Sequence, residues 1–448
     1  MRDLTGLIKA YDIRGTVPDQ LDADLTYQIG AAFAHITGAE LITVGHDMRE
    51  SSPELASAFA AGATSRGSDV LAIGLASTDL LYYASGTHDV PGAMITASHN
   101  PAGYNGIKLC LAGAAPVGQD TGLAEIRGLL ENGLPDYDGP TGTTRSDDLL
   151  RPYAEYLHSL VNLTGSRPLT IVVDAGNGMA GHTAPVVLDH PVFEVIPLYF
   201  ELDGTFPNHE ANPLEPANLV DLCAAVREHH ADLGLAFDGD ADRCFFVDEN
   251  GHPVSPSAII GLIVTRELAR HSGSAIVYNV ITSKAVPELV TEHGGDPIRT
   301  RVGHSFIKQV MAETGAVFGG EHSGHYYFRE FWRADTGMLA ALHVLAALGE
   351  TDQQLSTVAA QYSRYTASGE INRTIADVPA VLERVEAHYT AQGGTADRMD
   401  GLTVTLPEGA WFNLRPSNTE PLLRLNVEAA DEHSMARVRE DVLTLIGT

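Results

Sequence analysis

Hydrophobic and polar positions follow a local pattern that recurs along the chain. Each unit has a short apolar, β-rich run ending in a polar or glycine-rich loop, then a helical segment, then a second apolar run ending in a more unusual loop. The runs cover residues 41–45 and 92–95, then 169–173 and 233–237, then 275–280 and 316–318. Strands that alternate with helices predict α/β units, which bind ligands at the carboxyl ends of their strands.

The unusual loops that close the units are TASHNPAGYNG, DGDADR and GGEHSGH, and we expect them to face one crevice. Breaks rich in turn-forming residues fall at residues 131–147 and 248–257. After an apolar helix around residues 338–348, the pattern changes to strand, helix, short strands and helix, which predicts a smaller α+β domain. We therefore expect domains at residues 1–146, 147–250, 251–367 and 368–448.

Length and composition are typical of a globular chain with several domains, since 44% of the 448 residues are hydrophobic. The 3 cysteines lack CxxC spacing, which argues against a disulfide framework or a structural zinc site and favours a reducing compartment. The amino-terminal residues lack the apolar stretch of a signal peptide, and no apolar run is long enough to span a membrane. We expect a cytoplasmic protein without a membrane partner.

The formal net charge of -30 disfavours a nucleic-acid partner, because such binding needs a basic surface. It does not favour anionic small molecules either. Any anionic ligand must be captured at short range by a local cluster of Arg and Lys, where the field of that cluster dominates.

The segment TASHNPAGYNGIK, residues 96–108, places a serine hydroxyl directly after an apolar strand. His99 lies beside Ser98, and Lys108 follows as a cation or proton carrier. The alternative is an ordinary capping or turn serine, since Asn-Pro is a common turn signal. This segment alone does not decide between the two interpretations.

The segment DGDADR, residues 238–243, also follows an apolar strand, and its alternating carboxylates predict a site for a divalent cation. Asp238, Asp240 and Asp242 offer hard oxygen ligands, which suit magnesium completed by a phosphate. An EF-hand is a competing interpretation, but Arg243 stands where that motif needs glycine, and strands are expected on both sides. A plain acidic turn is disfavoured because the like charges would repel one another.

Two further loops carry polar clusters. In GGEHSGH, Glu321, Ser323 and His325 alternate around small residues and could bind sugar hydroxyls, while His322 with His325 could instead hold a transition metal. The second loop, RPSNTEP, combines a guanidinium, hydroxyls, an amide and exposed backbone N–H groups, which suit a phosphate dianion; a plain turn is the alternative. Its candidate phosphate-binding residues are Arg415, Ser417, Asn418 and Thr419.

The four loops, in this order and at these separations, resemble the phosphoserine, metal, sugar and phosphate loops of the α-D-phosphohexomutase family. AYDIRG at residues 10–15 resembles the amino-terminal signature of that family, so the resemblance runs over residues 11–421. It implies a four-domain architecture in which three related α/β domains with mixed sheets and a smaller α+β C-terminal domain surround a central cleft.

The resemblance implies a role for each matching residue. Ser98 would be phosphorylated, and Asp238, Asp240 and Asp242 would bind Mg2+ together with the phosphoserine. Lys108 and His325 would transfer protons, and His99 would position the loop. The remaining matches would contact the transferring phosphate (Arg14 and Arg243), the substrate and its hydroxyls (Tyr11, Glu321 and Ser323) and the distal phosphate (Arg415, Ser417, Asn418 and Thr419).

The implied reaction moves phosphate between O1 and O6 of a hexose. The phosphoserine would phosphorylate the free hydroxyl, a hexose 1,6-bisphosphate would turn around, and the other phosphate would return to Ser98. With His322 between Glu321 and Ser323, the sugar loop resembles that of the phosphomannomutase and phosphoglucomutase branch of the family. We therefore expect mannose phosphates as substrates, with glucose phosphates or dual specificity as the alternative. His46 departs from the usual form of its loop, GHDMRESS, and leaves Arg49 as its cation.

Two other classes of protein are alternatives to a mutase. A metal-dependent sugar phosphatase would also use an aspartate loop, but it would have no use for a phosphoserine loop. A non-catalytic sugar-phosphate binding protein would not need the proton carriers. We expect an enzyme that binds hexose phosphates and exists as a monomer or homodimer.

Overall fold

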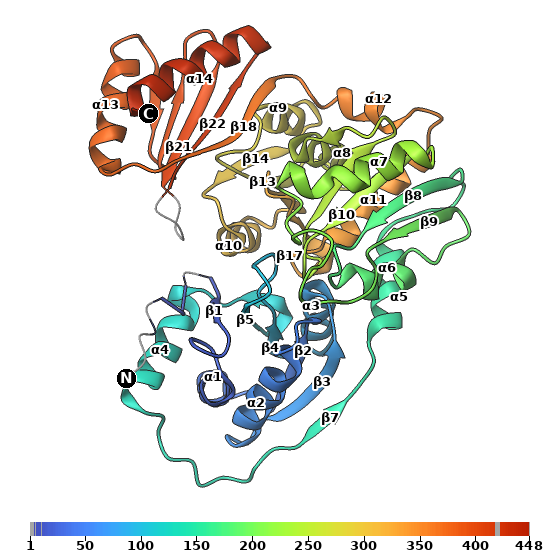
Figure 1. The fold of residues 1–448 in the computed structure, drawn as a ribbon, viewed down its shortest axis with the longest axis vertical. Coiled ribbons are helices and arrows are strands. Elements are labelled where there is room, and N and C mark those ends of the chain that lie inside the picture. Colours follow the sequence, from blue (N-terminus) through green and yellow to red (C-terminus); the bar gives the residue numbers. More distant parts are fainter. Residues whose placement is uncertain (1–3, 5, 10, 417–421, 448) are drawn as a thin grey trace.

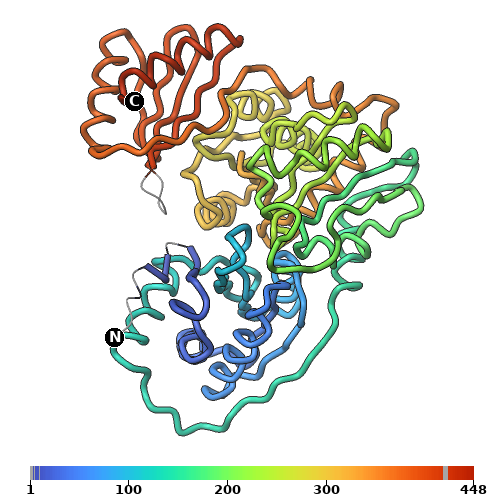
Figure 2. Tube along the Cα trace, viewed as in Figure 1, coloured from blue at the N-terminus to red at the C-terminus, as the bar shows by residue number. Residues whose placement is uncertain are grey.

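The computed structural model describes residues 4, 6–9, 11–416 and 422–447. These residues form four sheets that follow one another along the chain, each with its own helices. Figure 1 and Figure 2 show the four parts arranged in an arc, with the first at the bottom, the second and third beside each other, and the fourth at the top. Three related α/β units and a smaller α+β unit are thereby confirmed.

The first three sheets share one topology. In each, three parallel strands are ordered third, first, second, and an antiparallel strand pairs with the third. The elements of the first unit are β2 (Leu41–His46), α2 (Ser52–Thr64), β3 (Asp69–Leu75), α3 (Thr78–His88), β4 (Gly92–Ile95) and β5 (Tyr104–Leu111). Those of the second are β8 (Leu169–Asp174), α6 (Ala180–Val187), β9 (Phe193–Leu198), α7 (Val220–Glu228), β10 (Leu233–Phe237) and β11 (Cys244–Asp248). Those of the third are β13 (Ala275–Asn279), α9 (Ala285–Glu292), β14 (Asp296–Thr300), α10 (His304–Thr314), β15 (Phe318–Gly320) and β16 (Tyr326–Phe328).

Each unusual loop therefore occupies the same position in its repeat, between the third parallel strand and the antiparallel strand. We call them the serine loop (residues 96–103), the aspartate loop (residues 238–243) and the histidine loop (residues 321–325). They follow β4, β10 and β15, respectively. Because these strands are equivalent, three loops with different functional side chains occupy matching positions in the three repeats.

Other elements extend the repeats or connect them. The first sheet gains β1 (Ile13–Thr16), β6 (Ala115–Pro116) and β7 (Thr144–Ser146), the second gains β12 (Pro253–Val254), and the third gains β17 (Ala334–Asp335). The additional helices of the first three units are α1 (Ala23–Thr37), α4 (Leu123–Asn132), α5 (Leu150–Leu160), α8 (Pro256–Arg270), α11 (Gly337–Gly349) and α12 (Leu355–Ala360). Short 3-10 turns cover residues 112–114, 119–121, 216–219 and 329–331.

The fourth unit is the α+β domain that the sequence predicts. Its sheet, in the order β18-β22-β21-β20-β19, is antiparallel. Its elements are β18 (Thr366–Arg373), α13 (Val378–Thr390), β19 (Thr395–Asp397), β20 (Leu402–Thr405), β21 (Trp411–Pro416), β22 (Leu423–Ala429) and α14 (Glu432–Ile446).

The sequence pattern misses the second parallel strand along the chain in each repeat, namely β3, β9 and β14. In β9 and β14 the side chains are half-buried or exposed, except for Thr300, so neither strand has a continuous apolar run. The predicted strand at residues 316–318 lies too early, because pairing with Ile276 sets Phe318 at the start of β15. An EF-hand is excluded, since β10 and β11 flank the aspartate loop.

The first three domains share apolar packing, whereas the fourth has its own core. One continuous buried cluster contains residues of α3, β8, β10, α8 and α11. Helix α11 is apolar on all sides, which is typical of a helix inside a core. The fourth domain instead attaches through polar contacts, such as the 2.9 Å bond from Lys284 Nζ to the Gly409 carbonyl.

A buried carboxylate joins the first three domains. Asp79, in the first turn of α3, accepts hydrogen bonds from Tyr153 of α5 at 2.6 Å and from Thr336, before α11, at 2.7 Å. Ser77 also donates to it. Burial raises the pKa of Asp79 to about 6, despite these three donors.

Within the residues described, no helix combines the length and apolar character needed to cross a membrane.

Candidate active site

The hydroxyl of Ser98 lies at the contact between the serine loop and the aspartate loop. Its Oγ donates to Asp238 Oδ2 at 2.8 Å and lies 3.1 Å from His99 Nδ1. Ser98 has a φ of 50°, a left-handed conformation that is uncommon outside glycine and concentrates at functional sites. A Cβ on Gly239 would lie 2.3 Å from the Ser98 carbonyl oxygen, so only glycine lets the loops approach this closely.

Arg49 organises the backbone of the serine loop. The guanidinium donates to the carbonyl oxygens of three loop residues and of the first residue of β5, at 2.6 to 3.0 Å, and its Nε lies 3.2 Å from Asp47 Oδ2. The four carbonyls belong to Ser98, Asn100, Pro101 and Tyr104. The ring of Phe206, from the second domain, covers the guanidinium with its centroid 5.1 Å from Cζ. Arg49 is only 2% exposed, so its role is to organise the loop rather than to grip a phosphate.

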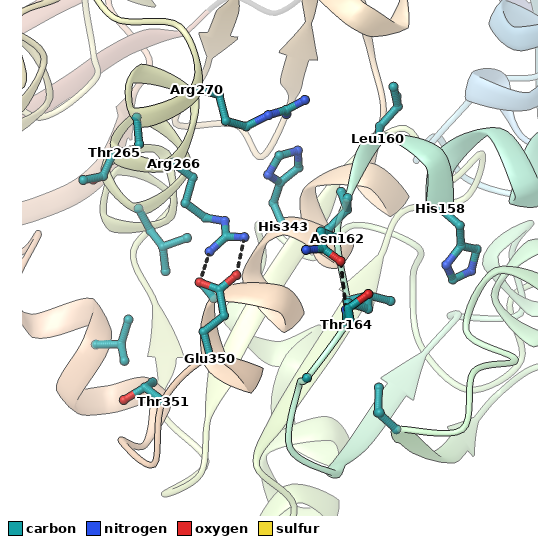
Figure 3. Close-up of a pocket in the computed structure, with 18 of the residues that line it drawn as sticks. His158, Leu160, Asn162, Thr164, Thr265, Arg266, Arg270, His343, Glu350 and Thr351 are labelled. Carbon is teal, nitrogen blue, oxygen red and sulfur yellow. Dashed lines mark hydrogen bonds and ion pairs between the residues drawn. The ribbon is translucent and has the colours of Figure 1, made fainter.

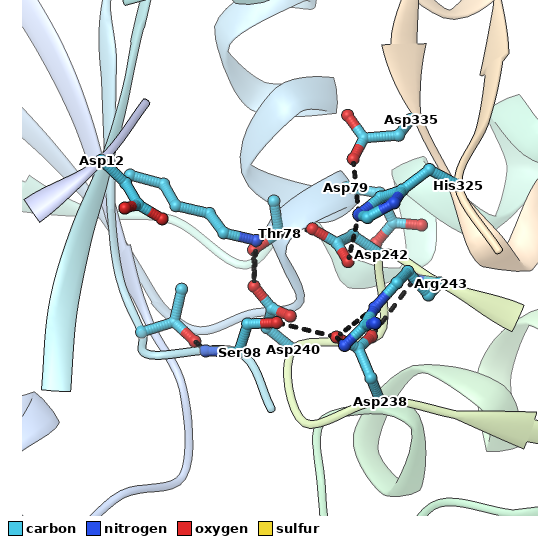
Figure 4. Close-up of polar contacts among 12 residues, drawn as sticks. Asp12, Thr78, Asp79, Ser98, Asp238, Asp240, Asp242, Arg243, His325 and Asp335 are labelled. Atoms are coloured by element: carbon cyan, nitrogen blue, oxygen red, sulfur yellow. Dashed lines mark hydrogen bonds and ion pairs between the residues drawn. The ribbon is translucent and has the colours of Figure 1, made fainter. Parts of the chain in front are cut away.

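The aspartate loop brings its three carboxylates together out of solvent. Asp238, Asp240 and Asp242 are 0%, 0% and 2% exposed, and one oxygen of each lies within 4.8 Å of the others. Figure 4 shows Asp238 joined to Ser98 and Asp242 beside His325. Burial and the neighbouring carboxylates raise the pKa of Asp238 to about 6, although Arg243 opposes this shift. This concentration of buried negative charge requires cations.

Two side chains supply positive charge directly. Lys108 Nζ, from β5, lies 2.6 Å from Asp240 Oδ2 and 2.5 Å from Asp242 Oδ2. Burial alone would lower the pKa of Lys108, but the two carboxylates raise it above its usual value. Arg243 donates to Asp238 Oδ2 from Nε at 3.0 Å and from Nη2 at 2.9 Å. Together, the two cations contact all three carboxylates of the aspartate loop.

The donor set fits a hard divalent cation. Carboxylate and phosphate oxygens are the ligands that magnesium prefers. The Oδ1 atoms of Asp240 and Asp242 are buried and have no hydrogen-bond partner within the described ranges. Such oxygens are costly to bury without a counterion. Asp238, Asp240, Asp242 and a phosphorylated Ser98 could hold the ion.

The histidine loop reaches the aspartate loop from the third domain. His325 Nε2 lies 3.5 Å from Asp242 Oδ1, and its Nδ1 lies 3.1 Å from Ser323 Oγ. Burial lowers the pKa of His325, but Asp242 and other carboxylates raise it more, so the net pKa is above its usual value. The carboxylates therefore favour the protonated form of His325 beside the predicted metal ligands.

The other members of the histidine loop are held differently. Glu321 Oε1 accepts from Asn279 and the Gly303 N–H, each at 3.0 Å, and Oε2 accepts from Tyr327 at 2.6 Å. These bonds fix the carboxylate from three sides. His322 Nδ1 instead lies 3.0 Å from Ser257 Oγ, so the structure does not join His322 and His325 in a metal-binding group among the described side chains.

The amino-terminal signature lies against the serine loop and the third domain. Arg14 Nη1 donates to Asn100 Oδ1 at 2.6 Å, and its Nε donates to Asp12 at 2.7 Å. The Tyr11 ring makes edge contacts with His304 and Phe306, with centroids 5.4 and 5.9 Å apart. Arg14 thus lies against the serine loop, whereas Tyr11 lies beside the third domain.

The fourth domain contributes Arg415, near the end of β21. The residue is 6% exposed, and its Nε has no hydrogen-bond partner among the residues described. Burial lowers the pKa of Arg415, while Asp400 opposes the shift. Ser417, Asn418 and Thr419 lie outside the described residues.

Comparison with known proteins bears directly on this arrangement. The sequence matches four domain families, described as "Phosphoglucomutase/phosphomannomutase, alpha/beta/alpha domain I", "domain II" and "domain III" and the corresponding "C-terminal domain", over residues 5–134, 151–251, 255–365 and 370–445. The chain belongs to the phosphoglucomutase/phosphomannomutase family. The resemblance drawn from the four loops is confirmed.

Relatives share nearly the full length of this family member. A phosphomannomutase of Escherichia coli is 40% identical over 450 residues, covering 98% of both chains. A phosphomannomutase/phosphoglucomutase of Pseudomonas aeruginosa is 35% identical and covers 97% of this chain and 94% of its own. The crystal structure of a phosphoglucomutase/phosphomannomutase family protein from Burkholderia thailandensis superimposes with a TM-score of 0.90 at 31% identity, covering 98% and 96% of the two chains.

Sequence reasoning missed several residues that shape this family site. Thr78 donates to Asp240 Oδ2 at 2.6 Å, and Asp335 forms a buried ion pair with Lys308 at 2.6 Å. Thr78 follows the unpredicted strand β3, and Asp335 belongs to the two-residue strand β17, so neither follows a recognised apolar run. The sequence shows Asp47 and Arg49 two residues apart, but it does not show that Arg49 binds the backbone carbonyls of the serine loop.

A separate groove of about 1380 Å³ runs between α5, α8 and α11 on the second and third domains (Figure 3). Arg266 and Glu350 form an ion pair along its wall at 2.7 Å. Among the described residues, its lining includes none of the predicted site residues. The groove is therefore not part of the site at Ser98.

Proposed function

We propose that this protein is a phosphomannomutase that interconverts mannose 1-phosphate and mannose 6-phosphate. One observation carries the proposal: Ser98 Oγ lies 2.8 Å from Asp238, within a buried cluster that also holds Lys108 and Arg243. A serine in this position can carry a phosphoryl group whose charge the surrounding cations neutralise. The names of the bacterial relatives support mannose phosphates, and the dual name of the Pseudomonas protein favours glucose phosphates as a second substrate.

The side chains divide the work of phosphoryl transfer. Arg243 and Arg14 would hold the phosphoryl oxygens, and Lys108 and His325 would exchange a proton with the sugar hydroxyl that attacks or leaves. His99 would orient Ser98, from which it lies 3.1 Å. A magnesium ion bound by Asp238, Asp240 and Asp242 would neutralise charge that develops on the transferring phosphate. Burial of the cluster strengthens each of these interactions, because the local dielectric is low.

The remaining groups would hold the part of the substrate that does not react. Glu321 and Ser323 would bind sugar hydroxyls, Tyr11 would border them, and Arg415 would grip the distal phosphate together with Ser417, Asn418 and Thr419. A hexose 1,6-bisphosphate intermediate must be bound in both orientations. Contacts to the hydroxyls and to one phosphate can serve both, so the design suits a mutase.

A sugar phosphatase is the main competitor. Hydrolysis needs a water molecule in place of the acceptor hydroxyl and has no need for a stored phosphoserine. The placement of Ser98 against the aspartate loop favours the mutase, because the hydroxyl already points at the carboxylates that would serve its phosphate.

The test is to follow mannose 1-phosphate and glucose 1-phosphate by phosphorus NMR with magnesium and a trace of hexose 1,6-bisphosphate. A mutase converts each 1-phosphate to a 6-phosphate without inorganic phosphate, and the ratio of kcat/KM values ranks the sugars. Steady growth of the inorganic phosphate signal without 6-phosphate would instead establish a phosphatase. Binding without turnover would establish a non-catalytic binding protein.

A further inference from the structure

A segment of the second domain, residues 203–211, contacts the residue that organises the serine loop. We call it the bridging segment. A Cβ on Gly204 would lie 2.6 Å from Arg49 Cα, so only glycine lets the two backbones approach this closely. Two residues further on, the Phe206 ring covers the Arg49 guanidinium, with its centroid 5.1 Å from Cζ. The bridging segment therefore packs on both the backbone and the side chain of Arg49.

The end of the same segment reaches the aspartate loop. A Cβ on Gly239 would lie 3.5 Å from the Cβ of Ala211, which is ordinary van der Waals distance. The Gly239 carbonyl accepts a hydrogen bond from the Met179 N–H at 2.9 Å, so this loop also rests on the residues after β8. The bridging segment thus connects the support of the serine loop to the aspartate loop, and its position affects how the two loops meet.

The bridging segment needs external support, because part of its backbone is strained. Phe206 has a φ of 53°, which is unfavourable for a bulky side chain and persists only where the surroundings hold it. Asn177, in the loop after β8, supplies two contacts. Its carbonyl accepts from the Asp203 N–H at 3.0 Å, and its Oδ1 accepts from Asn208 Nδ2 at 2.8 Å. The loop after β8 therefore holds the segment on either side of Phe206.

His209 adds an ionic anchor to this support. Its Nε2 lies 3.0 Å from Asp174 Oδ2, at the end of β8, and its Nδ1 lies 2.9 Å from the Glu210 carbonyl oxygen. A carboxylate and a carbonyl only accept hydrogen bonds, so both ring nitrogens must carry protons for both bonds to form. The side chains of His209 and Asp174 are only 14% and 1% exposed, and water therefore screens the pair little. This arrangement requires an imidazolium.

The other groups that face the imidazole agree with a positive charge on it. Burial lowers the pKa of His209, but the hydrogen bond and charge of Asp174 raise it more, and Asp221 of α7 adds to the increase. The Tyr199 ring makes an edge contact with the imidazole at a centroid distance of 5.4 Å, and its hydroxyl donates to Asp221 at 2.7 Å. This hydrogen bond raises the pKa of Tyr199 to about 12, so the phenol stays neutral. The net pKa of His209 is above its usual value.

We propose that His209 is a positioning residue of the active site: as an imidazolium held by Asp174, it fixes the bridging segment and thereby the contact between Ser98 and Asp238. Loss of its proton removes one of the two hydrogen bonds and the charge opposite Asp174, so the segment loosens. Arg49 then loses part of its cover, and the serine loop shifts relative to the aspartate loop. The effect on turnover, unlike the ionic anchor itself, rests on the proposed function.

The first experiment compares the pH profiles of wild type and His209→Gln on mannose 1-phosphate. Glutamine can donate one hydrogen bond to Asp174, but it carries no charge and does not titrate. At about pH 6 we expect the variant to have a kcat about 10- to 100-fold lower, as for a displacement of up to about 1 Å, and a KM within a few-fold of wild type. The ratio of the wild-type kcat to the variant kcat should fall as the pH rises through the pKa of His209, because wild type then loses its imidazolium.

The ratio isolates His209, since the other titrating groups are common to both proteins. The matched control is His252→Gln, which changes a histidine of the second domain that is 76% exposed and lies 3.8 Å from Asp248 Oδ1. Its kcat and pH profile should equal those of wild type. Urea unfolding at the same pH values confirms that His209→Gln is folded. A wild-type kcat in His209→Gln, or a ratio that does not change with pH, would overturn the positioning role.

A second experiment needs no turnover. Long-range proton–nitrogen NMR spectra of wild-type protein with 15N-labelled histidine report the protonation of each ring nitrogen, and His209→Gln assigns the His209 signals by their absence. At about pH 6.5, the usual pKa of histidine, most of the His209 rings should carry both protons. A mostly neutral ring at that pH would overturn the inference, whether or not the protein proves to be a mutase. Wild-type protein that isomerises no hexose phosphate at any pH would instead refute the proposed function.

Discussion

Arg49 Nη2 donates a 2.9 Å hydrogen bond to the backbone carbonyl of Ser98. The same guanidinium binds two further carbonyls of the loop and that of Tyr104 at the start of β5, so the backbone around Ser98 surrounds one buried cation. Phe206 of the second domain covers that cation, and the aspartate loop of the same domain touches Ser98. The position of Ser98 relative to Asp238 is therefore fixed by both sides of the domain contact.

Replacing Arg49 should misplace Ser98 without altering the sugar-binding groups. Lysine cannot reach four carbonyls with its single ammonium. We expect Arg49→Lys to lower kcat by about 100-fold, because a displacement of about 1 Å has that effect, while KM changes only a few-fold. Steady-state kinetics on mannose 1-phosphate measure this difference, and Arg66→Lys in the same domain is the control. A wild-type kcat in Arg49→Lys would contradict the positioning role.

Lys108 lies where it can affect both proton exchange and metal binding. Its ammonium contacts two of the predicted metal ligands, Asp240 and Asp242. Lys108→Met keeps the length of the side chain and removes the charge. We expect kcat to fall by about 10²- to 10⁴-fold, as for loss of a general acid or base. Because a neighbouring positive charge is removed, magnesium should bind about tenfold more tightly in calorimetry. Weaker magnesium binding would show that Lys108 supports the site instead of competing with the ion.

The hydroxyl of Thr78 orients a predicted metal ligand from the first domain. It donates to Asp240 Oδ2 at 2.6 Å, so Thr78→Val removes one hydrogen bond and keeps the shape of the side chain. We expect magnesium affinity to fall by about 10- to 100-fold, as for outer-shell partners of other metal ligands. Thr26 is a matched control, because its buried Oγ1 has no partner in the described parts of the chain. Equal magnesium affinities for Thr78→Val and Thr26→Val would refute this role.

Asp79 should make stability depend on pH in the direction opposite to that of an ordinary salt-bridged aspartate. Its pKa is raised from 3.8 to about 6 in the folded protein, chiefly by burial. The folded state therefore binds the proton more tightly, and the stabilisation is complete below about pH 4 and is lost as the pH rises through about 6. Between pH 5 and 7 this carboxyl should reduce the free energy of unfolding by about 1 kcal/mol.

The comparison of wild type with Asp79→Asn isolates this contribution, because the other titrating groups are common to both proteins. Urea unfolding at pH 5 and pH 7 should show wild type losing about 1 kcal/mol relative to the variant. A difference of the opposite sign would mean that the carboxylate is stabilised by Tyr153 and Thr336 more than burial destabilises it.

Much of the fold could be predicted because its strands have strong periodic signals. The runs before the serine and aspartate loops are buried throughout in β4 and β10, and they coincide with the predicted strands. The second parallel strands along the chain, β9 and β14, could not be predicted in this way, since most of their side chains are only partly buried or exposed. Their existence follows from the repeat rather than from their own sequence.

The candidate site could be predicted where chemistry clusters within one loop. The alternating spacing of Asp238, Asp240 and Asp242 is enough to predict a metal site. Arg49 and Thr78 act through contacts with residues far away in the sequence, and Asp335 lies near His325 because β17 pairs with β16. Such pairings depend on how domains and strands pack, which no local motif records. The roles assigned to the site residues stay predictions until tested.

The most direct test of the account is the intact mass of the protein before and after exposure to glucose 1,6-bisphosphate with magnesium. A single added phosphate, mapped to the peptide that contains Ser98, should be discharged by mannose 1-phosphate as bisphosphate is formed. Ser98→Ala should acquire no phosphate and should not isomerise the sugar. Wild-type protein that isomerises hexose phosphates with no phosphate ever found on Ser98, or a fully active Ser98→Ala variant, would contradict the central claim.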